Sequence, residues 1–117
     1  MLKARYSSDN TKVISASSDS SAKIWEPATA TAAIMTLNGH ADKVNDAIMN
    51  SDNSIVVTAS NDKTVKVWDI STTPNAITTV DVKSEAICVA LNSNGTKVAV
   101  GLKDNSVKVW DLIGQLS

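Results

Sequence analysis

The stretch "SNDKTVKVWD", residues 60–69, recurs in closely related form at two other places in the chain. The related stretches are "SSDSSAKIWE" at residues 17–26 and "LKDNSVKVWD" at residues 102–111. Their tryptophans, Trp25, Trp68 and Trp110, follow one another at intervals of 43 and 42 residues. Self-similarity at this period indicates a repeat architecture, in which each unit must stack on a neighbour to bury its apolar faces.

A second block of sequence repeats in register with the first. The segments "YSSDNTKVISAS" (6–17), "MNSDNSIVVTAS" (49–60) and "LNSNGTKVAVGL" (91–102) align without a gap. Because both blocks share one spacing, the chain consists of three copies of the same unit. Each copy also carries an aspartate six residues before its tryptophan, namely Asp19, Asp62 and Asp104.

Each unit is predicted to be β structure, because short β-branched segments alternate with clusters of turn residues such as "NDK". Four strands per unit, labelled a to d in chain order, account for the pattern, and no segment has a convincing amphipathic helical period. The expected strands are 2–7, 12–17, 22–25 and 32–37; 44–49, 55–60, 64–70 and 76–82; and 86–91, 97–102 and 106–112.

This pattern resembles the WD40-repeat β-propeller family. The supporting residues are the Gly39-His40 pair ahead of strand a, Asp62 in the b–c turn, and the Trp68-Asp69 pair that closes strand c. The first unit departs mildly by ending in Trp-Glu, and the third lacks the Gly-His pair. The resemblance implies an all-β fold of four-stranded antiparallel blades in a single array over residues 1–117, forming an incomplete ring. The blades are expected at about 1–39, 40–82 and 83–117, the last without its fourth strand.

In this family a His, a Ser or Thr, an Asp and a Trp form a buried hydrogen-bonded tetrad, which the resemblance implies here for His40, Ser60, Asp62 and Trp68. A Ser–His–Asp hydrolase is the alternative interpretation, but the Ser lies mid-strand without a nucleophile elbow and the chain has a single His. The structural role is therefore favoured, and no catalytic residue is expected. The partial sets of the other two blades are Ser17, Asp19 and Trp25, and Asp104 and Trp110.

The third copy has Leu102 where the second has Ser60, and Val82 where it has His40. Two polar members of the tetrad are thus replaced together by apolar side chains. Buried polar networks are stable when complete or absent, because a partial network leaves desolvated groups unpaired. The third blade is therefore expected to be repacked with an apolar core.

Composition restricts the function classes. A formal net charge of −1 argues against nucleic acid or an anionic membrane as the main partner, since both favour a basic excess. The longest apolar run, residues 86–91, is too short to span a bilayer, and no secretory signal is visible. The single cysteine, Cys88, allows no internal disulfide, and a small buried hydrophobe is the favoured role for it. We expect a reducing compartment, the cytoplasm, with the nucleus also open.

The sequence contains no Gly-rich phosphate loop and no metal-ligand cluster, so neither an enzyme, a cofactor nor a metal is expected. WD40 proteins usually bind other proteins on the rim where the d–a and b–c loops emerge, and this resemblance implies a protein-binding scaffold. The implied rim residues are Lys43, Asn45, Asn61, Glu85, Ile87, Lys103, Leu2 and Ser18.

Fewer than three full blades cannot close a ring, since propellers typically have four to eight. Three explanations stay open at this point. The chain is part of a longer protein that carries the missing blades, or a second copy completes the ring by oligomerisation, or the three blades form a stable open arc. The second explanation is the rival function: a structural module whose purpose is self-assembly.

Overall fold

A computed structural model describes residues 3–6, 12–25, 35–49, 55–69, 75–91 and 97–111, and all regular structure in these ranges is β. Among these residues no helix is long and apolar enough to cross a membrane. The strands are β1 (Lys3–Tyr6), β2 (Val13–Ala16), β3 (Ser21–Trp25), β4 (Met35–Asn38), β5 (Val44–Met49), β6 (Ile55–Ser60), β7 (Thr64–Asp69), β8 (Asn75–Asp81), β9 (Ala86–Leu91), β10 (Lys97–Leu102) and β11 (Val107–Asp111).

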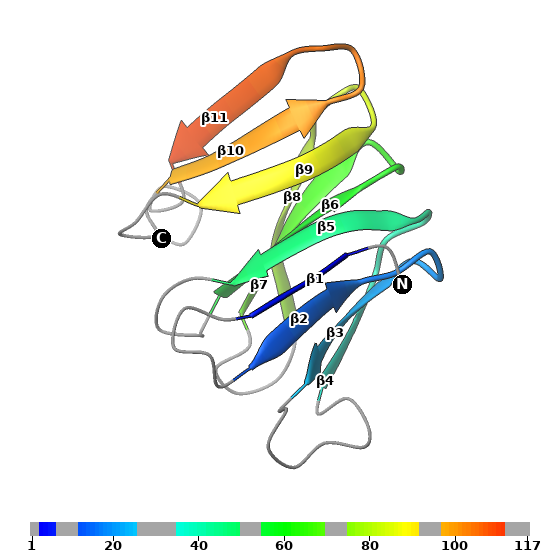
Figure 1. Cartoon of the computed structure of the whole chain (residues 1–117). Coiled ribbons are helices and arrows are strands. Elements are labelled where there is room, and N and C mark those ends of the chain that lie inside the picture. Colours follow the sequence, from blue (N-terminus) through cyan, green and yellow to red (C-terminus); the bar gives the residue numbers. More distant parts are fainter. Residues whose placement is uncertain are drawn as a thin grey trace.

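The strands form three antiparallel sheets, each built from one repeat of the sequence. The first has the order β1-β2-β3-β4, the second β5-β6-β7-β8, and the third, over its described residues, β11-β10-β9. Figure 1 shows the sheets as successive layers, with the leading strands β1, β5 and β9 side by side. The architecture is thus the expected array of propeller blades, and over the described ranges the three sheets do not close into a ring.

Strand bounds follow the sequence prediction closely. Those of β5, β6, β9 and β10 agree with it at both ends, and the described ends of the other strands differ by at most one residue. The expected strand residues 2, 7, 70 and 112 lie outside the described ranges. The expected strand 32–37 is observed as β4 at Met35–Asn38, while residues 32–34 lie outside the described ranges. Among the described residues, turns that contain an aspartate adjoin three of these strands: Asp62 follows β6, Asp104 follows β10 and Asp81 precedes β9.

Two buried apolar layers hold the sheets together, one on each side of the second sheet. Alternation along the strands divides the side chains between them: Val56 faces the first sheet, whereas Val57 faces the third. The layer between the first two sheets contains Ile14, Ala16, Ala22, Ile24, Leu37, Val44, Ala47, Met49, Val56 and Trp68. The layer between the second and third contains Ile55, Val57, Ala59, Val65, Val67, Val82, Ala86, Val89, Val98, Val100 and Leu102.

The outward face of the third sheet is apolar and exposed. Val107 and Val109 expose 68% and 61% of their surface, whereas their counterparts in the second sheet, Val65 and Val67, are fully buried. Cys88 also lies on this face and is exposed, so the expectation that it is buried is wrong. It packs over Gly101, where an added Cβ would lie 2.8 Å from the Cys88 sulfur. The difference arises because no sheet covers this face within the described chain.

Candidate functional site

A chain of side-chain hydrogen bonds lies on the face of the second sheet that is turned toward the first sheet. The Nε1–H of Trp68 donates to Thr58 Oγ1 at 3.0 Å, and that hydroxyl lies 2.6 Å from His40 Nε2. The other ring nitrogen, His40 Nδ1, lies 2.9 Å from Asp62 Oδ2. β7 supplies Trp68 and β6 supplies Thr58, while His40 and Asp62 come from the two adjoining loops. Gly39 permits the close approach, because an added Cβ would lie 3.1 Å from the indole ring of Trp68.

The partners determine the direction of each hydrogen bond. Asp62 as a carboxylate only accepts, so His40 Nδ1 carries the proton in that bond. The neutral ring then accepts at Nε2, which directs the Thr58 hydroxyl proton toward His40 and leaves the Thr58 oxygen to accept from Trp68. Each member therefore has a partner in one consistent arrangement, which requires His40 to be neutral.

The pKa directions agree with this arrangement. Burial lowers the pKa of His40 below its ordinary value and outweighs the opposing effect of Asp62. Burial also raises the pKa of Asp62, but hydrogen bonds from Thr64, from the Ala41 N–H and from His40 outweigh it and lower this pKa to about 2. At neutral pH the pair is therefore a neutral imidazole that donates to a carboxylate.

Ser60 does not belong to this chain, so the assignment of the tetrad hydroxyl to Ser60 is corrected to Thr58. Ser60 Oγ donates instead to the backbone carbonyls of Lys43 (2.7 Å) and Asp42 (3.2 Å). It also accepts the Asp62 N–H at 3.1 Å. The strand register explains the difference: Trp68 lies opposite Val56, so Thr58, two residues further along β6, is its diagonal neighbour on the same face of the sheet. Ser60 lies at the far end of β6. Ser60 therefore ties the b–c turn to the preceding loop.

The first sheet shows the same two-residue offset. Trp25 Nε1–H donates to Ser15 Oγ at 3.0 Å, and Ser15 corresponds to Thr58 in the repeat. The expected Ser17 instead accepts the Asp19 N–H at 3.2 Å, as Ser60 does for Asp62. Sequence reasoning missed Thr58 and Ser15, although both carry a hydroxyl at equivalent repeat positions.

In the third sheet the counterpart of Thr58 is Val100, which is fully buried, and the counterpart of His40 is Val82, which is 1% exposed. Leu102, the counterpart of Ser60, is also buried in the layer between sheets. The apolar replacement therefore involves Val82 and Val100, and Leu102 replaces the hydroxyl that ties the turn. The side chain of Trp110 lies outside the part of the chain that the structure describes.

The three aspartates share a turn-forming role. The Oδ1 of Asp62 accepts the Thr64 N–H at 2.9 Å, and the same bond runs from Ser21 to Asp19 and from Ser106 to Asp104, both at 3.0 Å. The hydroxyl of each of these three residues donates to the same carboxylate oxygen.

In each of these three turns, the residue between the aspartate and its N–H donor has a left-handed backbone conformation. Its φ is 75° at Ser20, 69° at Lys63 and 72° at Asn105. This geometry fits a three-residue hairpin turn with a bulge. In addition, Asp62 uses Oδ2 to bind His40 and the Ala41 N–H, the latter at 3.0 Å.

Sequence reasoning missed a buried ion pair at the leading strands. Asp46 on β5 has a fully buried side chain, and both of its oxygens lie 2.7 Å from Arg5 Nη2 on β1. Its Oδ2 also accepts the Val89 N–H of β9 at 3.1 Å, so one carboxylate connects all three sheets. The β-bulge between Val44 and Asp46 places the side chain there. The available signal was Asp46 itself, the single charged residue of a strand whose other residues are apolar except for Asn45.

Backbone hydrogen bonds place the predicted rim residues at one end of the sheets. Asn61 N–H donates to the Lys43 carbonyl and Lys103 N–H to the Glu85 carbonyl, each at 2.9 Å, which joins the b–c turns of the second and third sheets to the loops that precede these sheets. These residues, with Ser18, form what we call the loop rim: Ser18, Lys43, Asn45, Asn61, Glu85, Ile87 and Lys103. Leu2, the remaining predicted member, lies outside the described residues.

The loop rim combines internal contacts with exposed groups. Asn45 Nδ2 donates to Asn61 Oδ1 at 2.6 Å and to the Ala86 carbonyl at 2.8 Å, which connects the second and third sheets. Lys103 Nζ lies 3.6 Å from Glu85 Oε1. Ile87, on β9 next to Ala86, exposes 44% of its surface. The rim is therefore a mixed-charge surface with one apolar residue.

The Ser, His and Asp side chains do not form a nucleophilic arrangement. Ser60 donates to backbone carbonyls, and both nitrogens of His40 are engaged by Thr58 and Asp62 in the sheet interior. A catalytic serine requires its base at the hydroxyl and access to substrate. Within the described ranges, no three His, Cys, Asp or Glu side chains gather as metal ligands.

The family model described as WD domain, G-beta repeat (WD40), matches residues 2–26, 32–69 and 75–111. The three matched segments follow the three sheets in order. No curated protein matches the chain.

Proposed function

The chain belongs to the WD40 family of G-beta repeats, and on this premise we propose that it is a non-catalytic platform that binds another protein on its loop rim. WD40 repeats form protein-interaction scaffolds in general. The observation that carries the proposal is the loop rim itself, where the turns of all three sheets gather at one end on a rigid support. Binding residues are commonly displayed on loops held by such a scaffold.

The chemistry of the rim favours a protein partner. Lys43 is exposed, Glu85 and Lys103 are paired, and the exposed Ile87 follows Glu85 by two residues along the chain. A small apolar centre within a polar border is typical of non-obligate protein interfaces. We place the protein in the reducing interior of the cell, on the ground of its single exposed thiol.

The test uses a photo-crosslinking amino acid at Ile87 in cells, with the same amino acid at Thr79 as the control. Thr79 is exposed on the strand β8 and is not part of the loop rim. We expect defined crosslinked proteins from position 87 that decrease when Lys103→Glu reverses the neighbouring charge. Equal crosslinking from both positions, or crosslinks unaffected by Lys103→Glu, would contradict the rim as the binding surface.

Self-assembly is the second candidate function, because the outward face of the third sheet exposes Val107 and Val109. A contiguous exposed apolar face commonly marks an interaction site. In this proposal one copy covers the free face of another, which adds blades to the incomplete ring. Sedimentation across a dilution series separates this function from the first, since rim binding needs no self-association.

A further inference from the structure

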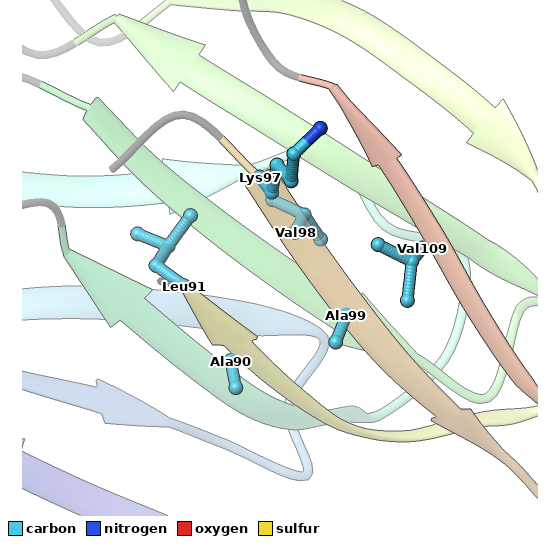
Figure 2. A pocket seen from close by; sticks show the side chains of 6 residues that line it. All are labelled: Ala90, Leu91, Lys97, Val98, Ala99 and Val109. Atoms are coloured by element: carbon cyan, nitrogen blue, oxygen red, sulfur yellow. The ribbon is translucent and has the colours of Figure 1, made fainter. Parts of the chain in front are cut away.

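The outward face of the third sheet contains a hollow of about 330 Å³. Figure 2 shows Ala90, Ala99 and Val109 around it, from three adjacent strands, with Leu91, Lys97 and Val98 completing the lining. The register places Ala90 and Val109 on either side of Ala99, so the hollow lies across β9, β10 and β11. The two alanines leave space that larger side chains occupy at the same positions of the second sheet.

The repeat shows what fills the corresponding place in the other sheets. In the second sheet the counterparts of Ala90, Ala99 and Val109 are Ile48, Val57 and Val67, and Leu91 of the following sheet packs against the same cluster. In the first sheet the counterparts include Ile14 and Ile24, which share a buried cluster with Met49 of the following sheet. Each covered face therefore receives the last residue of the next leading strand.

The residue that corresponds to Met49 and Leu91 in the first sheet is Tyr6, at the end of β1. No described sheet precedes the first, and Tyr6 exposes 64% of its surface. Met49, in contrast, is 8% exposed. Tyr6 lies beside Val13 on the free face of the first sheet, as Met49 lies beside Val56.

We infer that Tyr6 of one copy inserts into the hollow on the third sheet of a second copy. The inference rests on the second candidate function, self-assembly, and names its contact. The phenol ring of Tyr6 is larger than the side chains of its counterparts Met49 and Leu91. The hollow offers the additional space because Ala90 and Ala99 stand where the second sheet has Ile48 and Val57. The contact repeats the packing that already joins the sheets within the chain, so it is head to tail: the first sheet of one copy covers the third sheet of the next.

The test measures association by sedimentation velocity over a hundredfold dilution range. We expect concentration-dependent association of the parent chain, weakened by about tenfold or more in Kd by Ala99→Glu and by Tyr6→Ala. Thr79→Glu, which adds the same charge on the exposed outer strand β8, should leave Kd unchanged. An equimolar mixture of the Ala99→Glu and Tyr6→Ala variants should recover association, because one junction then joins an intact Tyr6 to an intact hollow.

A crosslink provides a second measurement that does not depend on the stability of Ala99→Glu. A chain with cysteines at positions 6 and 99, in a Cys88→Ser background, should form a disulfide between two copies. The two positions lie on the first and third sheets, so they are too far apart to pair within one chain. A concentration-independent monomer would refute both the contact and self-assembly. Association that survives Tyr6→Ala, or no recovery in the mixture, would refute the contact alone.

Discussion

Trp68 on β7 donates its indole N–H to Thr58 on β6, at 3.0 Å, and Thr58 in turn lies 2.6 Å from His40. The first contact joins the two central strands of the second sheet, and the second joins them to the loop that precedes β5. Thr58 is fully buried, so its hydroxyl has no access to water and must be satisfied inside the protein. The first sheet has the equivalent bond from Trp25 to Ser15, without a histidine beyond it among the described residues.

Replacing Thr58 with Val should destabilise the protein by about 1–3 kcal/mol, because the Trp68 N–H and His40 Nε2 lose their partner in a buried site. Thr58→Ser keeps the hydroxyl and is the matched control, with a smaller loss. Urea unfolding followed by tryptophan fluorescence measures both. Equal stability of Thr58→Val and the parent would show that the hydrogen-bond chain contributes nothing.

Stability should fall as the solution is acidified, through two groups. The folded pKa of His40 lies below its ordinary 6.5, so the unfolded chain binds a proton more readily and stability declines as pH falls below about 6.5. Asp62 has a folded pKa of about 2 against an ordinary 3.8, so its contribution is present above 3.8 and is lost as pH falls toward 2. Urea midpoints at pH 8, 6 and 5 test the His40 range, and midpoints at pH 4 and 3 test the Asp62 range.

A variant that imitates the third sheet is the control for this pH dependence. Thr58→Val with His40→Val copies the buried pair Val100 and Val82. It should lose the decline near pH 6 and keep the decline below pH 4, where Asp62 still accepts from Thr64 and Ala41. If the stability of this variant still declined near pH 6 as in the parent, a group other than His40 would be responsible for the decline.

Arg5→Met should cost about 3 kcal/mol, because it leaves the fully buried carboxylate of Asp46 without its close cation. Lys3→Met is the matched control: its Nζ lies 3.8 Å from Asp46 and its side chain is 47% exposed, so we expect a loss below about 1 kcal/mol. Thermal unfolding of both variants decides the matter. Equal losses would contradict the assignment of Arg5 as the main partner.

Leu102→Ser should destabilise the third sheet by about 2 kcal/mol or more, since it removes apolar packing between the second and third sheets. Leu102→Val is the control and should lose less than about 1.5 kcal/mol. Differential scanning calorimetry of the two variants provides the comparison. A neutral Leu102→Ser would mean that a hydroxyl at this position is satisfied as it is at Ser60.

Residue patterns within each repeat determined the strands, and the resemblance to WD40 repeats implied the antiparallel blades and their array. Each unit contains its own turn residues, and neighbouring strands along the chain pair with one another, so local sequence is sufficient for the strands and for their pairing within a sheet. The shared role of Asp19, Asp62 and Asp104 follows for the same reason, because each aspartate accepts from a residue only two positions away.

Only the tertiary structure decided which hydroxyl meets Trp68 and what Asp46 binds. Thr58 and Ser60 lie on the same face of β6, and the choice between them depends on the register of β6 against β7, which the pattern of residue types does not specify. Arg5 and Asp46 lie on different sheets, and their contact depends on how the leading strands pack together. Side-chain contacts between separate units arise from packing geometry, whereas the units themselves arise from local sequence.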